Sequence, residues 1–227
     1  MNKLILALLI VLPVTSFSQK IFYGKVVVGN YWMADMKKLQ KEYREEFIEE
    51  GIPAEIVLSF PVSIQGEFGV DFAIYDALLK EYLVGGFINY SLTSGVINYS
   101  DYSGRVDLEQ EFKRLSLGIK GATDIRKDLQ VYAKISYHMT YLDFFKRTTL
   151  TGAEPVEDEV RLEPEGISCE PGLQWTKAVD RFRFSVHGGY EFSMITSQGN
   201  YLTNDKDDPV YPGWSGFRLG AGVGFAL

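Results

Sequence analysis

The sequence contains a single cysteine, Cys169, among its 227 residues. One thiol excludes an internal disulfide and any zinc site built from several cysteines. Positive charge is also scarce, because 23 Lys and Arg residues stand against 30 Asp and Glu residues and give a net charge of -7. Nucleic-acid-binding domains are normally basic, so we expect no nucleic acid among the partners of this chain.

Long apolar runs are missing after residue 18. No later stretch holds 18 uninterrupted apolar residues, so we expect no transmembrane helix in 19–227. Residues 1–18 have the pattern of a secretory signal peptide. Lys3 precedes an apolar run over 4–14, and Ser16 and Ser18 supply the small residues of a cleavage site. We therefore predict export through a cleaved signal peptide, and a mature domain over 19–227.

Aromatic residues and glycine are abundant instead, at 14% and 22 residues, which favours β-structure with tight turns. Apolar and polar residues alternate over segments of about ten positions, as in strands with two different faces. The segment 129–142 is the clearest example. One face carries Leu129, Val131, Ala133, Ile135, Tyr137, Met139 and Tyr141, and the other carries Gln130, Tyr132, Lys134, Ser136, His138 and Thr140.

Eight segments show this alternation to some degree, near 21–31, 60–74, 83–99, 112–124, 129–142, 166–178, 181–194 and 216–227. The breaks between them are short near 76–81, 125–128 and 179–181, and long at 32–55, 100–111, 150–165 and 200–214. Short and long connections at alternate ends are typical of an up-and-down barrel. We predict an all-β fold, an eight-stranded antiparallel transmembrane β-barrel with its short turns on the periplasmic side.

The two faces predict which side of the barrel meets lipid. A narrow eight-stranded barrel cannot enclose a face of large apolar side chains, but it can enclose charged residues and glycines. The apolar face should therefore point outward into a membrane. The polar network predicted to fill the lumen consists of Glu67, Asp71, Lys134, His138, Arg181, Arg183, His187, Glu191 and Arg218. The alternative is a soluble, lipocalin-like carrier, which would enclose the apolar face around a ligand.

The C-terminal segment 216–227 resembles the last strand of outer-membrane β-barrels, which ends in alternating apolar residues that the barrel-assembly machinery reads. Here these residues are Phe217, Leu219, Ala221, Val223, Phe225 and Leu227. The layout of 20–227 looks like the small barrels of the Bacteroidetes type, in the OmpA/porin-like superfamily. The resemblance implies an outer-membrane location in a Gram-negative cell, with outer-membrane lipid, lipopolysaccharide and the assembly machinery as partners.

Residues 34–50 break the strand pattern. Met36, Leu39, Tyr43 and Phe47 form one apolar stripe at helical spacing, and Gly51 and Pro53 follow it. Strand parity places this helix in the first extracellular loop. It could pack on the barrel as part of the loop, bind a protein partner, or lie on the membrane surface.

Candidate chemistry is sparse. Ser136, Ser185, Glu191, His138 and His187 share the predicted lumen, and a Ser/His/acid set could support acyl hydrolysis. Some eight-stranded outer-membrane barrels act on lipid A through such residues, which makes a lipid A-modifying enzyme a second alternative. Those sites face the membrane, however, so we expect no enzyme here. We expect no cofactor either.

Two loops are acidic. The segment 150–165 carries six carboxylates against one Arg, and 204–208 carries three against one Lys. They could hold a divalent cation, but the EF-hand pattern is absent and we expect solvated loops without a metal site. The turn at 98–104, rich in Tyr, Ser and Gly, has a composition suited to recognition. We expect a structural or interaction role, with a protein partner at the extracellular loops.

Overall fold

The computed structural model describes residues 19–75, 81–152, 154–197, 210 and 213–227. The predicted signal peptide therefore lies outside the described residues, as does most of the predicted break at 200–214. The elements are β1 (Gln19–Tyr31), α2 (Ala34–Glu49), β2 (Glu55–Ser59), β3 (Ser63–Tyr75), β4 (Glu81–Ser100), β5 (Gly104–Arg126), β6 (Leu129–Leu150), β7 (Val156–Leu162), β8 (Glu165–Val179), β9 (Phe182–Ser197) and β10 (Gly216–Ala226).

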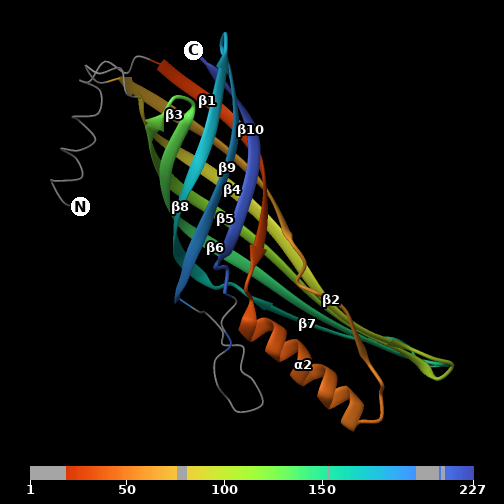
Figure 1. Cartoon of the computed structure of the whole chain (residues 1–227). Helices are drawn as coiled ribbons and strands as arrows, with labels where there is room; N and C mark the ends of the chain where they lie inside the picture. The colour runs from red at the N-terminus through yellow and green to blue at the C-terminus, as the bar shows by residue number, and fades with distance from the viewer. Residues whose placement is uncertain (1–18, 76–80, 153, 198–209, 211–212) are drawn as a thin grey trace.

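Eight of the strands pair into a closed ring. The order is β4-β3-β1-β10-β9-β8-β6-β5, and β5 pairs with β4 to complete the circle (Figure 1). All of these pairs are antiparallel, and each strand lies beside its neighbours in the sequence once β2 and β7 are set aside. The fold is therefore mostly antiparallel β-structure with one helix, as the alternation predicts.

The two ends of the ring differ. Two-residue turns at 127–128 and 180–181 close one end, and Asp128 and Asp180 adopt the positive φ angles that such tight turns need. The first residue of β1 and the last of β10 lie at this same end. The helix α2 leaves from the opposite end (Figure 1). We refer to the two ends as the short-turn end and the helix end.

The predicted long breaks at 100–111 and 150–165 are wrong. β4 and β5 continue as one hairpin that is paired from Tyr82↔Thr123 to Ser100↔Arg105. Within the second break, residues 156–162 form β7, which pairs with β6. With β2 on β4, these strand ends make a five-stranded sheet that extends beyond the ring (Figure 1). We call residues 32–59, 93–113 and 142–164 the projection.

The projection escaped prediction because charged residues alternate with its apolar ones. Along β5, Val106, Leu108 and Phe112 are buried, whereas Glu109 and Glu111 on the other parity are exposed. This is the pattern of a strand with one wet face, although the density of charge is typical of a loop.

The helix α2 covers the buried face of the projection. Its predicted stripe is confirmed, since Met36, Leu39 and Phe47 are buried and Tyr43 is partly buried against them. Phe47 packs with Ile97 of β4. The helix ends at Glu49, and backbone N–H groups after it return to the last turn, with Ile52 N donating to Phe47 O at 2.7 Å. No helix of the described residues combines the length and the apolarity needed to cross a bilayer.

The wall of the ring is apolar outside. Large outward side chains from every ring strand are exposed by more than a third of their surface. They include Phe22, Val26, Phe68, Val84, Ile88, Leu117, Ile119, Ile135, Leu173, Phe184, Val186, Leu219 and Val223. Cys169 is exposed on the same parity. Polar residues of the opposite parity fill the interior, so the predicted orientation of the two faces is the one found.

Candidate functional site: a chain of buried charges beneath an aromatic cluster

The interior of the ring holds seven charged side chains whose signs alternate, each from a different strand. They are Arg114 of β5, Glu191 of β9, Arg218 of β10, Glu170 of β8, Lys134 of β6, Glu67 of β3 and Lys25 of β1. All seven are at most 6% exposed. Strand alternation positions them, because every second residue of each strand points inward.

We call these seven side chains the charge chain. Its first half, from Arg114 to Glu170, is tightly hydrogen-bonded. Arg114 donates from both terminal nitrogens to Glu191, at 2.8 and 3.1 Å, which is a bidentate pair. Glu191 also accepts from the Tyr31 hydroxyl at 3.0 Å. Arg218 then bridges Glu191 at 3.3 Å and Glu170 at 2.5 Å.

The second half continues through lysines. Lys134 Nζ lies 2.6 Å from a Glu67 carboxylate oxygen and 3.8 Å from Glu170. Lys25 lies 3.8 Å from Glu67 and donates to Gln174 Oε1 at 3.0 Å. Lys134–Glu67 and Lys25–Gln174 link strands that are not neighbours in the ring, whereas Lys134–Glu170 and Lys25–Glu67 join adjacent strands. The first two contacts hold opposite walls together, although removing charges from water offsets much of their attraction.

Two further ion pairs lie beside this chain. Lys120 contacts Asp71 at 2.5 Å. Near the short-turn end, Arg183 donates to Glu81 at 2.8 Å and to Gln19 at 3.0 Å. The ring interior therefore carries its cations and anions in close pairs.

The predicted lumen residues fall into this site with one exception. Glu67, Asp71, Lys134, His138, His187, Glu191 and Arg218 are buried inside the ring, and Arg183 is partly buried. Arg181 lies instead in the exposed turn between β8 and β9, so it does not belong to the polar network inside the ring. The alternation ends once the chain enters the turn, and parity no longer assigns Arg181 to a face.

Sequence reasoning missed several members of the network, namely Lys25, Arg114, Lys120 and Glu170. Each of the four lies at an inward-pointing position of its strand, and other inward polar side chains lie two or four positions away. The signal was present in the alternation, but β1, β5 and β8 alternate less clearly than β6.

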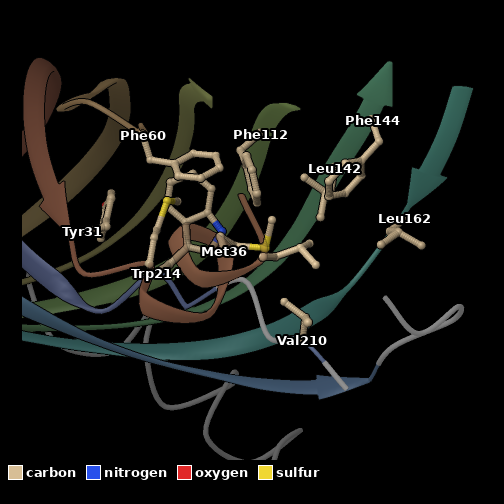
Figure 2. Packing of buried hydrophobic residues seen from close by; sticks show 11 residues of the cluster. Tyr31, Met36, Phe60, Phe112, Leu142, Phe144, Leu162, Val210 and Trp214 are labelled. Carbon is tan, nitrogen blue, oxygen red and sulfur yellow. The ribbon is translucent and has the colours of Figure 1, made fainter. Parts of the chain in front are cut away.

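An aromatic cluster closes the interior at the helix end. Trp214, Tyr31, Phe60 and Phe112 are buried with Met36 in one group (Figure 2). The Trp214 ring lies 4.6 Å from the guanidinium carbon of Arg114, a cation–π contact. The charge chain therefore ends directly beneath an apolar layer, and the low local dielectric there strengthens its contacts.

Little free space remains around the charged side chains in the middle of the ring, whereas a pocket of about 490 Å³ opens at the short-turn end beside Glu81, Gln130 and Arg183. Glycines make room for large inward side chains, and a Cβ on Gly220 would lie 2.4 Å from the His187 ring. A cavity of about 20 Å³ lies beside Lys25, Asp71 and Lys120, which is room for roughly one water molecule.

The outer face of the projection carries a ladder of exposed ion pairs. Arg161 contacts Asp143 at 2.6 Å, Lys113 contacts the same carboxylate at 3.6 Å, and Arg147 contacts Glu157 at 3.3 Å. Such exposed pairs contribute little stability each. They do make this face fully wettable, in contrast to the apolar wall of the ring.

The tip of the projection is a tight turn built around Asp101. Its carboxylate accepts from Ser103 Oγ at 2.6 Å, from the Tyr99 hydroxyl at 2.5 Å and from the Ser103 N–H at 2.8 Å. The bond from the Ser103 hydroxyl, followed by that from Tyr99, lowers the pKa of Asp101 to about 2. Tyr102 at this tip is 94% exposed.

Neither a hydrolytic triad nor a metal centre assembles among the described residues. His138 Nε2 lies 3.3 Å from Ser193 Oγ, whereas Ser136 contacts Ser168 at 2.8 Å. No group of three or more His, Cys, Asp or Glu side chains in the described part of the chain is arranged to hold a metal ion. The acidic segment 204–208 lies outside the described residues.

The residues of the predicted assembly signal lie on one side of β10. Phe217, Leu219, Val223 and Phe225 point outward, and Leu227 follows the strand and is 68% exposed. Tyr190 on β9 packs edge-on against Phe217 at 5.0 Å between ring centroids. The segment thus belongs to the outward apolar surface.

No protein-family model and no curated protein matches this chain. Among solved structures, similar ones include Ail, the attachment invasion locus protein of Yersinia pestis, with 11% identity, a TM-score of 0.43 and coverage of 92% of this chain and 97% of that chain. Neisserial surface protein A is 10% identical, with a TM-score of 0.37 and coverage of 91% of this chain and 96% of that chain. The transport unit of the autotransporter AIDA-I from Escherichia coli is 9% identical, with a TM-score of 0.32 and coverage of 91% of this chain and 88% of that chain. Likenesses this weak assign neither a family nor a function.

Proposed function

We propose that this chain is an integral outer-membrane β-barrel of eight strands with a structural or interaction role. One observation carries the proposal: a closed ring of strands is apolar on its outer wall and charged inside. In water this arrangement would expose apolar surface on all sides. In a bilayer the closed ring satisfies every ladder hydrogen bond and the outer wall meets lipid.

The height of the apolar wall fits a membrane. Along β6 the outward residues are apolar or aromatic from Val131 to Tyr141, and the next one is Asp143. Ten residues at about 3.4 Å each span about 34 Å along the strand. A tilt of about 40° reduces this to about 26 Å, which matches the band of about 25 Å in outer-membrane barrels.

The filled interior supports a barrel that does not conduct. The charge chain crosses the lumen between opposite walls, and the aromatic cluster lies over its upper end. We expect the purified protein to open no stable channels in a planar bilayer. Stable unitary conductance would show that the interior opens in the membrane and would refute this part of the proposal.

Neither alternative has a specific observation in its favour. A lipocalin-like carrier needs an apolar cavity inside the ring, whereas the interior is charged. The cavity at Lys25, Asp71 and Lys120 holds about 20 Å³. The pocket of about 490 Å³ at the short-turn end is lined by charged and polar residues such as Glu81, Asp124 and Arg183. A lipid A-modifying enzyme needs its Ser and His on the outer wall. His138 and Ser136 are buried on the inner side.

The interaction role is best placed on the projection. It extends from the helix end of the ring, which would be the extracellular end, and it has a charged face with an exposed tyrosine at its tip. These features support a partner-facing surface among the extracellular loops. Lipopolysaccharide would surround the wall below it, and the barrel-assembly machinery would read the outward residues of β10.

Heat-modifiability combined with fractionation tests the proposal. The full chain is expressed in a Gram-negative host, outer membranes are isolated, and the protein is run on SDS gels with and without boiling. We expect it in the outer-membrane fraction, with a mobility that changes on boiling. Recovery in the soluble periplasm would refute membrane insertion and favour the lipocalin-like carrier instead.

A further inference from the structure

A groove of about 590 Å³ lies in the outer wall of the ring, where β9, β10 and β1 run side by side (Figure 1). Val28, Leu219 and Gly188 lie next to one another across the three strands and line its apolar part. Phe217 and Tyr190 line the part towards the helix end. The volume is within the range of small-ligand sites.

Gly188 accounts for the depth of this groove. The other outward positions of β9 are Phe182, Phe184, Val186, Tyr190, Phe192 and Met194. Packing does not require a glycine at 188, because an added Cβ would meet its nearest neighbours at 3.8 Å, an ordinary contact distance. At Gly189, which faces inward, the same Cβ would lie 2.6 Å from the Tyr132 hydroxyl. Glycine inside a strand weakens it, and often marks a place where a ligand approaches the backbone.

The groove has a polar end. Asn30 lines it opposite Phe217, on the side of the helix end. Trp32 directly follows the end of β1 and is 77% exposed. Tryptophan is enriched at the level of lipid headgroups because its ring is part apolar and part polar. At this end Asn30 thus adds a polar amide to a lining that also includes Phe217, Tyr190 and Val62, in the direction in which a lipid of that leaflet changes from chain to headgroup.

We propose that this groove seats one acyl chain of a membrane lipid, with the headgroup near Asn30 and Trp32. The inference rests on the proposed function, since it assumes that the outer wall faces lipid. The groove is continuous with the apolar wall on both sides, so a chain enters it without leaving the hydrocarbon. A seated chain also fills the volume that Gly188 leaves empty, which restores dispersion contacts along the wall.

Photocrosslinking tests the groove directly. The full mature chain is placed in nanodiscs of phosphatidylcholine that contain a phosphatidylcholine probe with a diazirine in mid-chain. After irradiation, crosslinked positions are mapped by peptide mass spectrometry. We expect crosslinks on β1, β9 and β10 to exceed those on the opposite wall, β4 and β5, at least threefold. The substitution Gly188→Leu should fill the groove and abolish this excess.

Gly86→Leu is the matched control. Gly86 is an outward glycine of β4, on the opposite wall, and a Cβ there would meet its nearest atom at 3.7 Å. The control should leave the crosslinking pattern unchanged. If Gly188→Leu does not fold, Gly188→Val replaces it, and the distribution in the unmodified chain still decides.

Other results would overturn the inference in distinguishable ways. Even labelling around the ring would show a barrel in lipid without a seat for a chain. Crosslinks between two copies of the protein through the groove would assign it to self-association instead. The absence of any labelling from the bilayer would overturn the proposed function itself.

Discussion

Removing the carboxylate of Glu191 should destabilise the protein by about 3–5 kcal/mol, the usual cost of breaking one side of a buried ion pair. In Glu191→Gln the shape is kept, but Arg114 loses its carboxylate partner while it remains 1% exposed beneath Trp214. Arg218 keeps Glu170 at 2.5 Å. The penalty therefore arises mainly from one orphaned guanidinium, and it corresponds to a change of about two to nearly four orders of magnitude in the unfolding equilibrium.

Urea unfolding of the protein folded in lipid vesicles measures this cost, with tryptophan fluorescence and gel mobility as readouts. Glu157→Gln is the control, because Glu157 pairs with Arg147 at 3.3 Å while both side chains are about half exposed, and it should cost less than about 1 kcal/mol. The double variant Arg114→Met, Glu191→Gln removes the orphaned cation and should recover part of the loss. Equal effects of Glu191→Gln and Glu157→Gln would refute the assignment of the charge chain as a buried network.

Three further changes test other parts of the structure. Phe47→Ala should release α2 from the strands of the projection, because Phe47 is 4% exposed in its cluster and such truncations cost about 3–5 kcal/mol. Limited proteolysis should then cut within α2 while the boiling-dependent gel shift of the ring persists, and loss of that shift would contradict the idea that the ring folds independently of α2. Gly220→Val should prevent folding, since an added Cβ would lie 2.4 Å from the His187 ring. Gly121→Val should fold, because an added Cβ there has no atom within 4 Å. The gel shift distinguishes the two variants, and normal folding of both would show that the interior is not tightly filled. Hydrogen bonds lower the pKa of Asp101 from 3.8 to about 2 in the folded protein. The contribution of this carboxylate to the order of the tip should therefore be complete above pH 4 and be lost as the pH falls through 2. An NMR titration of Asp101 with a midpoint near pH 4 would contradict this.

The ring could be predicted from the sequence because a strand with one apolar and one polar face alternates over its whole length. The residues of 129–142 reveal both faces of β6 without reference to any other strand, and the apolar stripe of α2 likewise depends only on local spacing. Which face points outward follows from volume, since large side chains cannot fill a narrow ring.

The contacts of the site could not be predicted in the same way. Glu67 and Lys134 are 67 positions apart and meet only because the ring closes. The projection was missed for a different reason. Residues such as Glu109, Glu111 and Asp143 have the composition of a loop, and the helix that buries the opposite face is supplied from another part of the chain.

The distribution of charge separates the two parts of the molecule more sharply than their secondary structure does. The projection contains 17 acidic and 9 basic residues, whereas the remainder of 19–227 contains 13 of each. If the ring is surrounded by lipid as proposed, its interior holds no free counterions, and the buried cations and anions there lie in close pairs. An acidic excess in water is screened within about 8 Å at physiological salt. It would also repel the phosphates of a lipopolysaccharide surface, and this repulsion favours a projection that stands away from the membrane over one that lies upon it.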